Sequence, residues 1–221
     1  MAPLHWVAML REGLRFVASV LMVSGALLIA DAGMTLLWQE PVSAFLAARQ
    51  QNALADELEE PDTQAQVTRV FRDPSPAGRE RLKGDAIGKI ELPALDKSYY
   101  VIEGTDTESL RKGPGHYEDT PLPGQRGTVG IAGHRTTNGA PFRDIDDLEP
   151  RDEIRVDMPY GTFVYSVEET RIVDDNDLWV KDPVGYDRLM LSACHPLYSA
   201  AQRIIVFARF QRREAPEVKK S

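Results

Sequence analysis

A chain of 221 residues with 43% hydrophobic content can bury one sizeable core and leave residues for an anchor or a tail. Its formal net charge of −8, without any basic run, argues against a nucleic-acid-binding protein, because phosphate binding needs clustered Lys and Arg. The single cysteine, Cys194, excludes an internal disulfide.

An apolar segment near the N-terminus predicts a membrane anchor over residues 16–38. Asp31 is its only charge, and a helix of this length spans ~34 Å, enough for a bilayer. Arg11 and Arg15 precede it, and acidic residues follow it. The positive-inside rule therefore places residues 1–15 in the cytoplasm and the remaining chain outside the cell.

The same segment also fits a cleaved signal peptide. Residues 16–30 are apolar, and Asp31 lies between two alanines as in a cleavage site. Because the apolar stretch continues and ends on Trp38, an interfacial residue type, we favour an anchor that is not cleaved. Both interpretations export the domain, whereas a buried soluble helix would be unusually uniform in hydrophobicity.

Residues 39–85 are expected to form an extracellular stalk and linker. Residues 43–60 are rich in helix formers but poor in large apolar side chains, which predicts a polar, partly frayed helix that need not pack on anything. Residues 60–85 hold three prolines and no sustained period, a pattern typical of a linker. The ordered domain is then expected over residues 86–213, followed by a disordered tail over residues 214–221.

From Ala86 onward, the sequence consists of short segments rich in β-branched and aromatic residues and bounded by Gly and Pro. Seven such segments are residues 87–95, 99–104, 127–134, 152–161, 162–173, 187–194 and 203–210. Helical signals are confined to residues 106–113 and 139–150. Short strands without long helices between them predict an all-β domain, either an antiparallel-rich closed barrel or a sandwich.

Three residues at strand ends are candidates for a catalytic site. A nucleophilic cysteine needs a partner that handles protons and a donor that holds the developing oxyanion. Cys194 ends one apolar strand, His134 ends another, and Arg203 begins a third. A free cysteine is most often a small buried apolar residue. An unpaired thiol in an oxidising compartment is nevertheless a liability without a use, which favours a catalytic role.

Strand alternation favours His134 over His195 as the partner of the thiol. Successive strand residues face opposite sides, so His195 cannot easily reach the thiol if the strand continues. His134 shares its face with Gly130 and Ala132, whose small size predicts a shallow trough in front of the imidazole. If the strands flanking residues 195–202 pair as neighbours, this connection forms a wall of the trough, and an extended peptide fits there.

Motif segments in this order resemble the sortase family. They are GIAGHR at residues 130–135 and LSACHPLYSAAQR at residues 191–203. The longer segment GPGHYEDTPLPGQRGTVGIAGHRTTNGAPF, residues 113–142, is similar to class E sortases of high-GC Gram-positive bacteria. The resemblance covers residues 86–213. It implies a closed eight-stranded β-barrel with short helices, preceded by an N-terminal transmembrane helix and a stalk.

The resemblance also implies the activity of a membrane-anchored cysteine transpeptidase. Cys194 is then expected to attack the Thr-Gly bond of a C-terminal sorting signal (LAXTG or LPXTG type) on a secreted protein and to form a thioester. An amine, usually from a lipid-linked peptidoglycan precursor, resolves the thioester. His134 matches the family's catalytic histidine, which transfers protons, and Arg203 matches its catalytic arginine, which stabilises the oxyanion. The resemblance implies no metal or organic cofactor and no nucleic-acid partner.

Residues around the implied groove are the candidates for substrate binding. Tyr117 is the candidate contact for the second residue of the signal, where class E sortases tend to prefer Leu-Ala over Leu-Pro, and a packing tyrosine is an equally good interpretation. His116 lies in the same segment, near the expected groove. Ser192 and Ala193 precede the nucleophile, and Ala193 replaces a hydroxyl residue found there in many sortases, so substrate positioning is expected to differ.

The sequence departs from two other classes of cysteine enzyme. An L,D-transpeptidase packs His, Gly, Cys and Arg into a few residues, and a papain-like protease places its Cys before its His, neither of which is seen here. A pilin-polymerising sortase and an inert scaffold with a sortase fold remain as alternatives. Four acidic residues within residues 144–149 are interpreted as a solvated turn rather than a calcium site.

Overall fold

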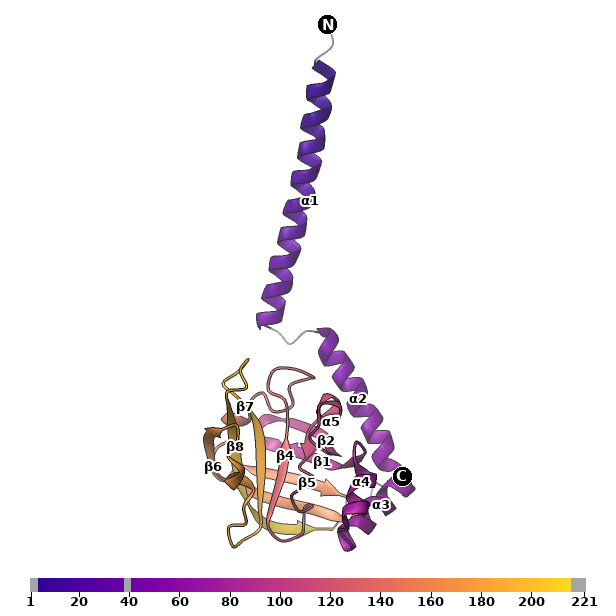
Figure 1. The fold of residues 1–221 in the computed structure, drawn as a ribbon, viewed down its shortest axis with the longest axis vertical. Coiled ribbons are helices and arrows are strands. Elements are labelled where there is room, and N and C mark those ends of the chain that lie inside the picture. Colours follow the sequence, from indigo (N-terminus) through magenta and orange to yellow (C-terminus); the bar gives the residue numbers. More distant parts are fainter. Residues whose placement is uncertain (1–3, 38–40, 216–221) are drawn as a thin grey trace. The chain divides into compact units, whose positions relative to one another are not determined.

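Two units make up the described part of the chain, which covers residues 4–37 and 41–215 of this computed structural model. The first is helix α1 (Leu4–Leu37), and the second, from Ser43 onward, contains a barrel (Figure 1). Within α1, the stretch Arg11–Gly33 is long and apolar enough to cross a membrane. The expected end of the anchor, Trp38, lies outside the described residues.

The second unit is built on a closed β-barrel, as the sequence and the resemblance predict. Among the described residues, the strands are β1 (Ala86–Leu92), β2 (Lys97–Glu103), β3 (Gly115–His116), β4 (Thr128–Ala132), β5 (Glu153–Met158), β6 (Gly161–Asp174), β7 (Arg188–His195) and β8 (Gln202–Glu214). Their order around the barrel is β1-β2-β3-β4-β7-β8-β6-β5. Neighbouring strands are antiparallel except β2 with β3 and β4 with β7, which run parallel.

One strand and one strand boundary differ from the expectation. Strand β3 has only two residues, but it pairs with β2 on one side and with β4 on the other and so closes the barrel. Strand β8 continues through Glu214, whose carboxylate lies 2.7 Å from Arg155, so the expected disordered tail is wrong at its first residue. The part of that tail at residues 216–221 lies outside the described residues.

Alternating burial along the strands produces the core. In β5, Ile154, Val156 and Met158 are buried, and the residues between them are partly exposed. Phe163 and Tyr165 of β6 fill the barrel interior with two large aromatic rings. The short helices that connect the strands are α5 (Thr107–Lys112) and the 3₁₀ turns η1 (Pro93–Leu95), η2 (Ile145–Asp147) and η3 (Leu178–Lys181).

Residues 41–82 form packed helices, so the expectation of a linker over residues 60–85 is wrong. The helices are α2 (Pro41–Glu59), α3 (Pro61–Arg72) and α4 (Pro76–Leu82). Val67 and Val70 of α3 are 0% and 4% exposed, and both belong to the main core together with Leu82. Two of the three prolines that suggested a linker, Pro61 and Pro76, begin α3 and α4, because a proline fits the first helical position, where no N–H is needed.

Helix α2 is bound to the barrel by the buried side chain of Leu54 and by polar side chains. The Gln51 amide accepts a hydrogen bond from the Tyr100 N–H (2.6 Å) and donates one to the Lys112 carbonyl (3.0 Å). The Glu57 carboxylate accepts the N–H of Ala86 at 3.0 Å. These bonds satisfy main-chain groups at the start of β1, in β2 and at the end of the helix that spans residues 107–112. The folded unit therefore begins near residue 43 instead of residue 86.

Candidate active site

The parallel pairing of β4 with β7 brings His134 to the level of Cys194. The pairing ends at Ala132 opposite Ser192, and the N–H of Gly133 donates to the Ser192 carbonyl at 3.0 Å. His134 and Cys194 each follow a residue of the last pair by two positions. Continuing this register by two residues places them at the same level and on the same face, one step beyond the last pair.

The antiparallel pairing of β7 with β8 adds Arg203 to this row. Cys194 and Arg203 are directly opposite each other, so their side chains share a face. The Nη1 of Arg203 donates to the carbonyls of Ala200 and Gln202, both at 3.0 Å, which holds the guanidinium at the base of the β7–β8 connection. The expected neighbouring strands are thus present, and the three candidate side chains form one row across β8, β7 and the chain that follows β4.

The row lies on the outer face of the barrel. On β7, Leu189, Leu191 and Ala193 belong to the interior core, and the alternate residues Ser192 and Cys194 face outward. Ala193 is 3% exposed and its side chain faces the interior, so the expectation that it contacts the substrate is wrong. The hydroxyl missing at this position would have pointed into the barrel and away from the nucleophile.

His134 is half-buried at the point where its chain leaves β7. Its carbonyl accepts the N–H of Phe142 at 2.9 Å, which closes the loop that follows β4. Burial lowers the pKa of the imidazole below its usual range, because desolvation disfavours the charged form. The neutral imidazole is therefore the main form at neutral pH. Cys194 is also half-buried.

His195 faces away from the row, as strand alternation predicts. It is the last residue of β7, and its Nδ1 lies 3.4 Å from Nη1 of Arg135. The Arg135 side chain also contacts Asp146 of η2, a residue of the acidic turn. In that turn Asp144 pairs with Lys97, and the described residues contain no cluster of three or more side chains that could hold a metal ion.

His116 is buried in the fold and is not in a groove. It is 0% exposed, its Nδ1 lies 2.7 Å from a Glu103 carboxylate oxygen, and Glu103 is also 0% exposed. Its Nε2 lies 3.0 Å from the Pro121 carbonyl and 3.1 Å from the Thr120 hydroxyl. Since both ring nitrogens are bonded inside the protein, the expectation that His116 binds substrate is wrong.

Tyr117 lies on the outer face, next to the row. Its hydroxyl donates to the Ser192 hydroxyl at 3.4 Å, a long hydrogen bond. A Cβ atom added to Gly130 would lie 2.8 Å from the Tyr117 ring, so this ring covers the place where Gly130 was expected to leave a trough. Ser192 is buried, whereas Tyr117 is partly exposed and is the more accessible of the two to a substrate.

The connection between β6 and β7 packs on the same outer face. Val180 of η3 packs with Met190 and Phe207 in a small apolar cluster, which Tyr117 joins. Arg188 is 6% exposed and holds this connection, since it donates to the Val180 carbonyl at 2.9 Å. Sequence reasoning missed Arg188, although its position six residues before the cysteine on the same strand places it on the same face.

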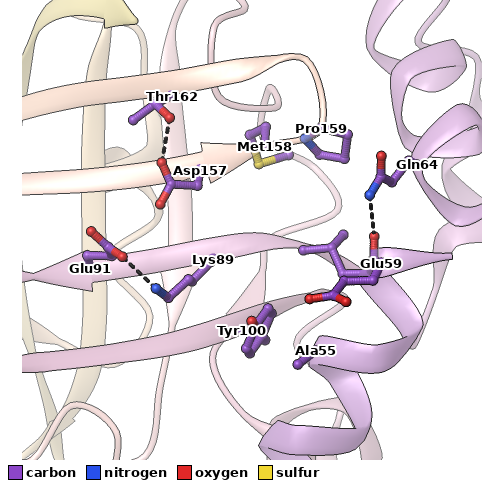
Figure 2. Close-up of a pocket in the computed structure, with 11 residues that line it drawn as sticks. Ala55, Glu59, Gln64, Lys89, Glu91, Tyr100, Asp157, Met158, Pro159 and Thr162 are labelled. Atoms are coloured by element: carbon purple, nitrogen blue, oxygen red, sulfur yellow. Dashed lines mark hydrogen bonds and ion pairs between the residues drawn. The ribbon is translucent and has the colours of Figure 1, made fainter. Parts of the chain in front are cut away.

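A pocket of about 420 Å³ lies elsewhere, between α2 and strands β1, β2 and β5 (Figure 2). Among the contacts drawn in Figure 2 are the pairs of Lys89 with Glu91 and of Asp157 with Thr162. Each of these two pairs is 2.5 Å apart. No residue of β4, β7 or β8 lines this pocket. It is therefore separate from the row of His134, Cys194 and Arg203.

This row provides the groups that acyl transfer needs. A thiol can act as a nucleophile, an imidazole in the same row can exchange protons, and a guanidinium on the other side can donate hydrogen bonds to an oxyanion. The β7–β8 ladder holds the backbones of Cys194 and Arg203 in place, and His134 follows the last pair of the β4–β7 ladder by two residues.

Comparison with known proteins identifies the fold and its family. The family model described as "Sortase domain" matches residues 90–211, more than half of the chain. The solved structure of sortase E from Streptomyces avermitilis is similar to the chain with a TM-score of 0.57 and 33% identity, over 63% of this chain and 96% of that one.

Two curated relatives give the same result. Sortase D of Bacillus subtilis is 34% identical over 130 residues, which are 57% of this chain and 64% of that protein. Sortase SrtE1 of Streptomyces coelicolor is 32% identical over 142 residues, which are 57% of this chain and 40% of that protein. The chain thus spans less than two thirds of these two relatives. The barrel and the match of the family model over most of it show that the chain belongs to the sortase family.

Proposed function

We propose that the chain is a cysteine transpeptidase that cleaves the Thr-Gly bond of a C-terminal sorting signal and transfers the secreted protein to an amine. The observation that supports this function is the row of His134, Cys194 and Arg203 across β4, β7 and β8. The family supplies the reaction type, and the row supplies one side chain for each role.

In the first step, the Cys194 thiolate attacks the threonine carbonyl carbon, and Arg203 donates hydrogen bonds to the oxyanion that forms. The C–N bond to glycine then breaks, and the imidazolium of His134 gives its proton to the leaving amine. In the second step, an amine attacks the resulting thioester. It gives a proton to the neutral imidazole, and the thiolate leaves.

Peptide cleavage tests this function. The full chain in detergent is incubated with LAXTG and LPXTG peptides and with an amine acceptor, and the products are separated and weighed by mass spectrometry. We expect an amide between the threonine and the acceptor, and its loss in Cys194→Ala, His134→Ala and Arg203→Ala. Arg209→Ala, an arginine on the same strand that pairs with Glu168, is the matched control and should retain activity. A chain that cleaves neither peptide would favour the inert scaffold.

Tyr117 is proposed to contact the second residue of the signal. Its hydroxyl makes only a long bond to Ser192, so a substrate amide can compete for it, and proline lacks that amide N–H. Tyr117→Phe, which keeps the ring, should lower turnover of an LAXTG peptide roughly 2- to 10-fold, the effect of one hydrogen bond, and should spare an LPXTG peptide. An equal loss for both peptides would contradict this role.

The barrel is proposed to lie outside the cell, with α1 in the membrane and the N-terminus in the cytoplasm. Exported proteins with sorting signals and cell-wall amines are then accessible to it. Because Cys194 is the only cysteine, a membrane-impermeant maleimide added to intact cells should label the chain, and Cys194→Ala should not react. Labelling that appears only after lysis would contradict this topology.

A further inference from the structure

Arg135, the residue after His134, is a buried arginine whose guanidinium has three partners. It is 3% exposed. Its Nε donates to the Arg143 carbonyl at 3.1 Å, its Nη2 to Asp146 at 2.6 Å, and its Nη1 to His195 at 3.4 Å. Neither the charge pattern nor the motifs in the sequence predicted that this side chain is buried and multiply hydrogen-bonded.

The partners of Arg135 lie where the main-chain ladder between β4 and β7 has ended. Among the described residues, the last main-chain bond of this pair joins Gly133 to Ser192. The carbonyl of His134 already bonds to Phe142 in its own loop. The imidazole and the thiol therefore lie beyond the last rung, where no main-chain bond sets the separation of the two chains.

The contact between Arg135 and His195 spans this open end. His195 directly follows Cys194, so one side-chain bond joins the residue after the imidazole to the residue after the thiol. Arginine has only donors, so Nδ1 of His195 accepts, and the neutral ring carries its proton on Nε2. Asp146 and the Arg143 carbonyl hold the other two sides of the planar guanidinium, a fork that lysine cannot reproduce.

We propose that Arg135 and His195 form a positioning clamp that sets the separation of His134 and Cys194. The inference rests on the proposed function, because the separation of His134 and Cys194 affects catalysis only if these two side chains act together. Neither clamp residue touches the reacting atoms. Without the clamp, the imidazole and the thiol drift apart while the barrel stays folded.

The test combines turnover with a reaction that needs no substrate. His195→Ala removes the acceptor and leaves the Arg135–Asp146 ion pair, and His195→Gln restores an acceptor. We expect His195→Ala to lower kcat roughly 10- to 100-fold with KM within about 2-fold, and His195→Gln to recover part of this loss. Thermal midpoints should stay within about 4 °C of the wild type. Arg155→Gln removes another multiply paired arginine, on β5, and serves as the control with unchanged kcat.

Alkylation of the single thiol by iodoacetamide, measured against pH, separates the clamp from a purely structural role. His134→Ala should shift the alkylation profile of the wild type, and it should shift the profile of His195→Ala much less, because the imidazole is already displaced. Equal shifts in both backgrounds, or a full kcat for His195→Ala, would overturn the clamp and leave the proposed function intact. If His134→Ala changes neither turnover nor alkylation in the wild type, both proposals fall.

Discussion

Replacing Val67 and Val70 by alanine tests whether α3 is part of the folded barrel unit. Both side chains are buried in the main core, at 0% and 4% exposure. Each change removes two carbon atoms, and at about 0.8 kcal/mol per buried CH₂ group the pair costs about 3 kcal/mol, before any cavity term. For a unit of this size we expect the thermal midpoint to fall by roughly 6–12 °C.

The assay is thermal unfolding of the full chain in detergent, followed by near-ultraviolet circular dichroism of the barrel aromatics. Arg69→Ala, an exposed residue of the same helix, is the matched control and should change the unfolding free energy by about 0.5 kcal/mol or less. If the double valine variant melts at the wild-type temperature, α3 does not pack on the barrel in solution, and the linker interpretation of residues 60–85 is restored.

Three further predictions concern the site and its surroundings. Burial lowers the pKa of His134, so the imidazole is protonated only at low pH. The acid limb of the kcat/KM profile should therefore have its midpoint below pH ~6.5, and a midpoint above that value would contradict the lowered pKa. Gly130→Ala brings a Cβ atom within 2.8 Å of the Tyr117 ring, and it should destabilise the fold by about 1–3 kcal/mol and lower kcat/KM for peptides; unchanged urea unfolding and turnover would show that the ring is free to move. Glu103→Ala leaves His116 buried without its carboxylate, so urea unfolding should show a loss of about 3–5 kcal/mol, and a loss below 1 kcal/mol would mean that the pair is not buried.

The barrel was predictable because alternating burial along a strand produces alternating apolar and polar residues in the sequence. The segments around Cys194, His134 and Arg203 alternate as strands do, and this alternation also placed His195 on the opposite face, where the structure has it. Strand β3 could not be predicted in this way, because two residues are too few to show an alternating pattern.

The packed helices before the barrel were missed for a different reason. Helix α3 buries only two large apolar side chains. Helix α2 buries Leu54 and otherwise bonds to the barrel through Gln51 and Glu57, polar residues that look like solvent-exposed positions in a sequence. Their partners lie 29 to 61 residues away, so no local pattern reveals them. Without that information, the prolines that begin α3 and α4 look like residues that interrupt secondary structure.

At the site, local reasoning failed where a side chain depends on a distant partner. His116 looked accessible among Gly and Pro residues, but its partner Glu103 comes from β2, 13 residues earlier. The clamp of Arg135 likewise depends on His195, 60 residues away. The inward direction of Ala193, by contrast, follows from the same alternation that separates His195 from the thiol, and it could have been predicted.

The most direct test of the proposed function is the intact mass of the full chain after incubation with an LAXTG peptide and no added amine, followed by an acid quench. We expect a mass increase equal to the acyl fragment that ends in threonine. The added mass should be located on Cys194, removed by hydroxylamine and absent in Cys194→Ala. An unmodified chain beside uncleaved peptide, for both LAXTG and LPXTG sequences, would contradict it.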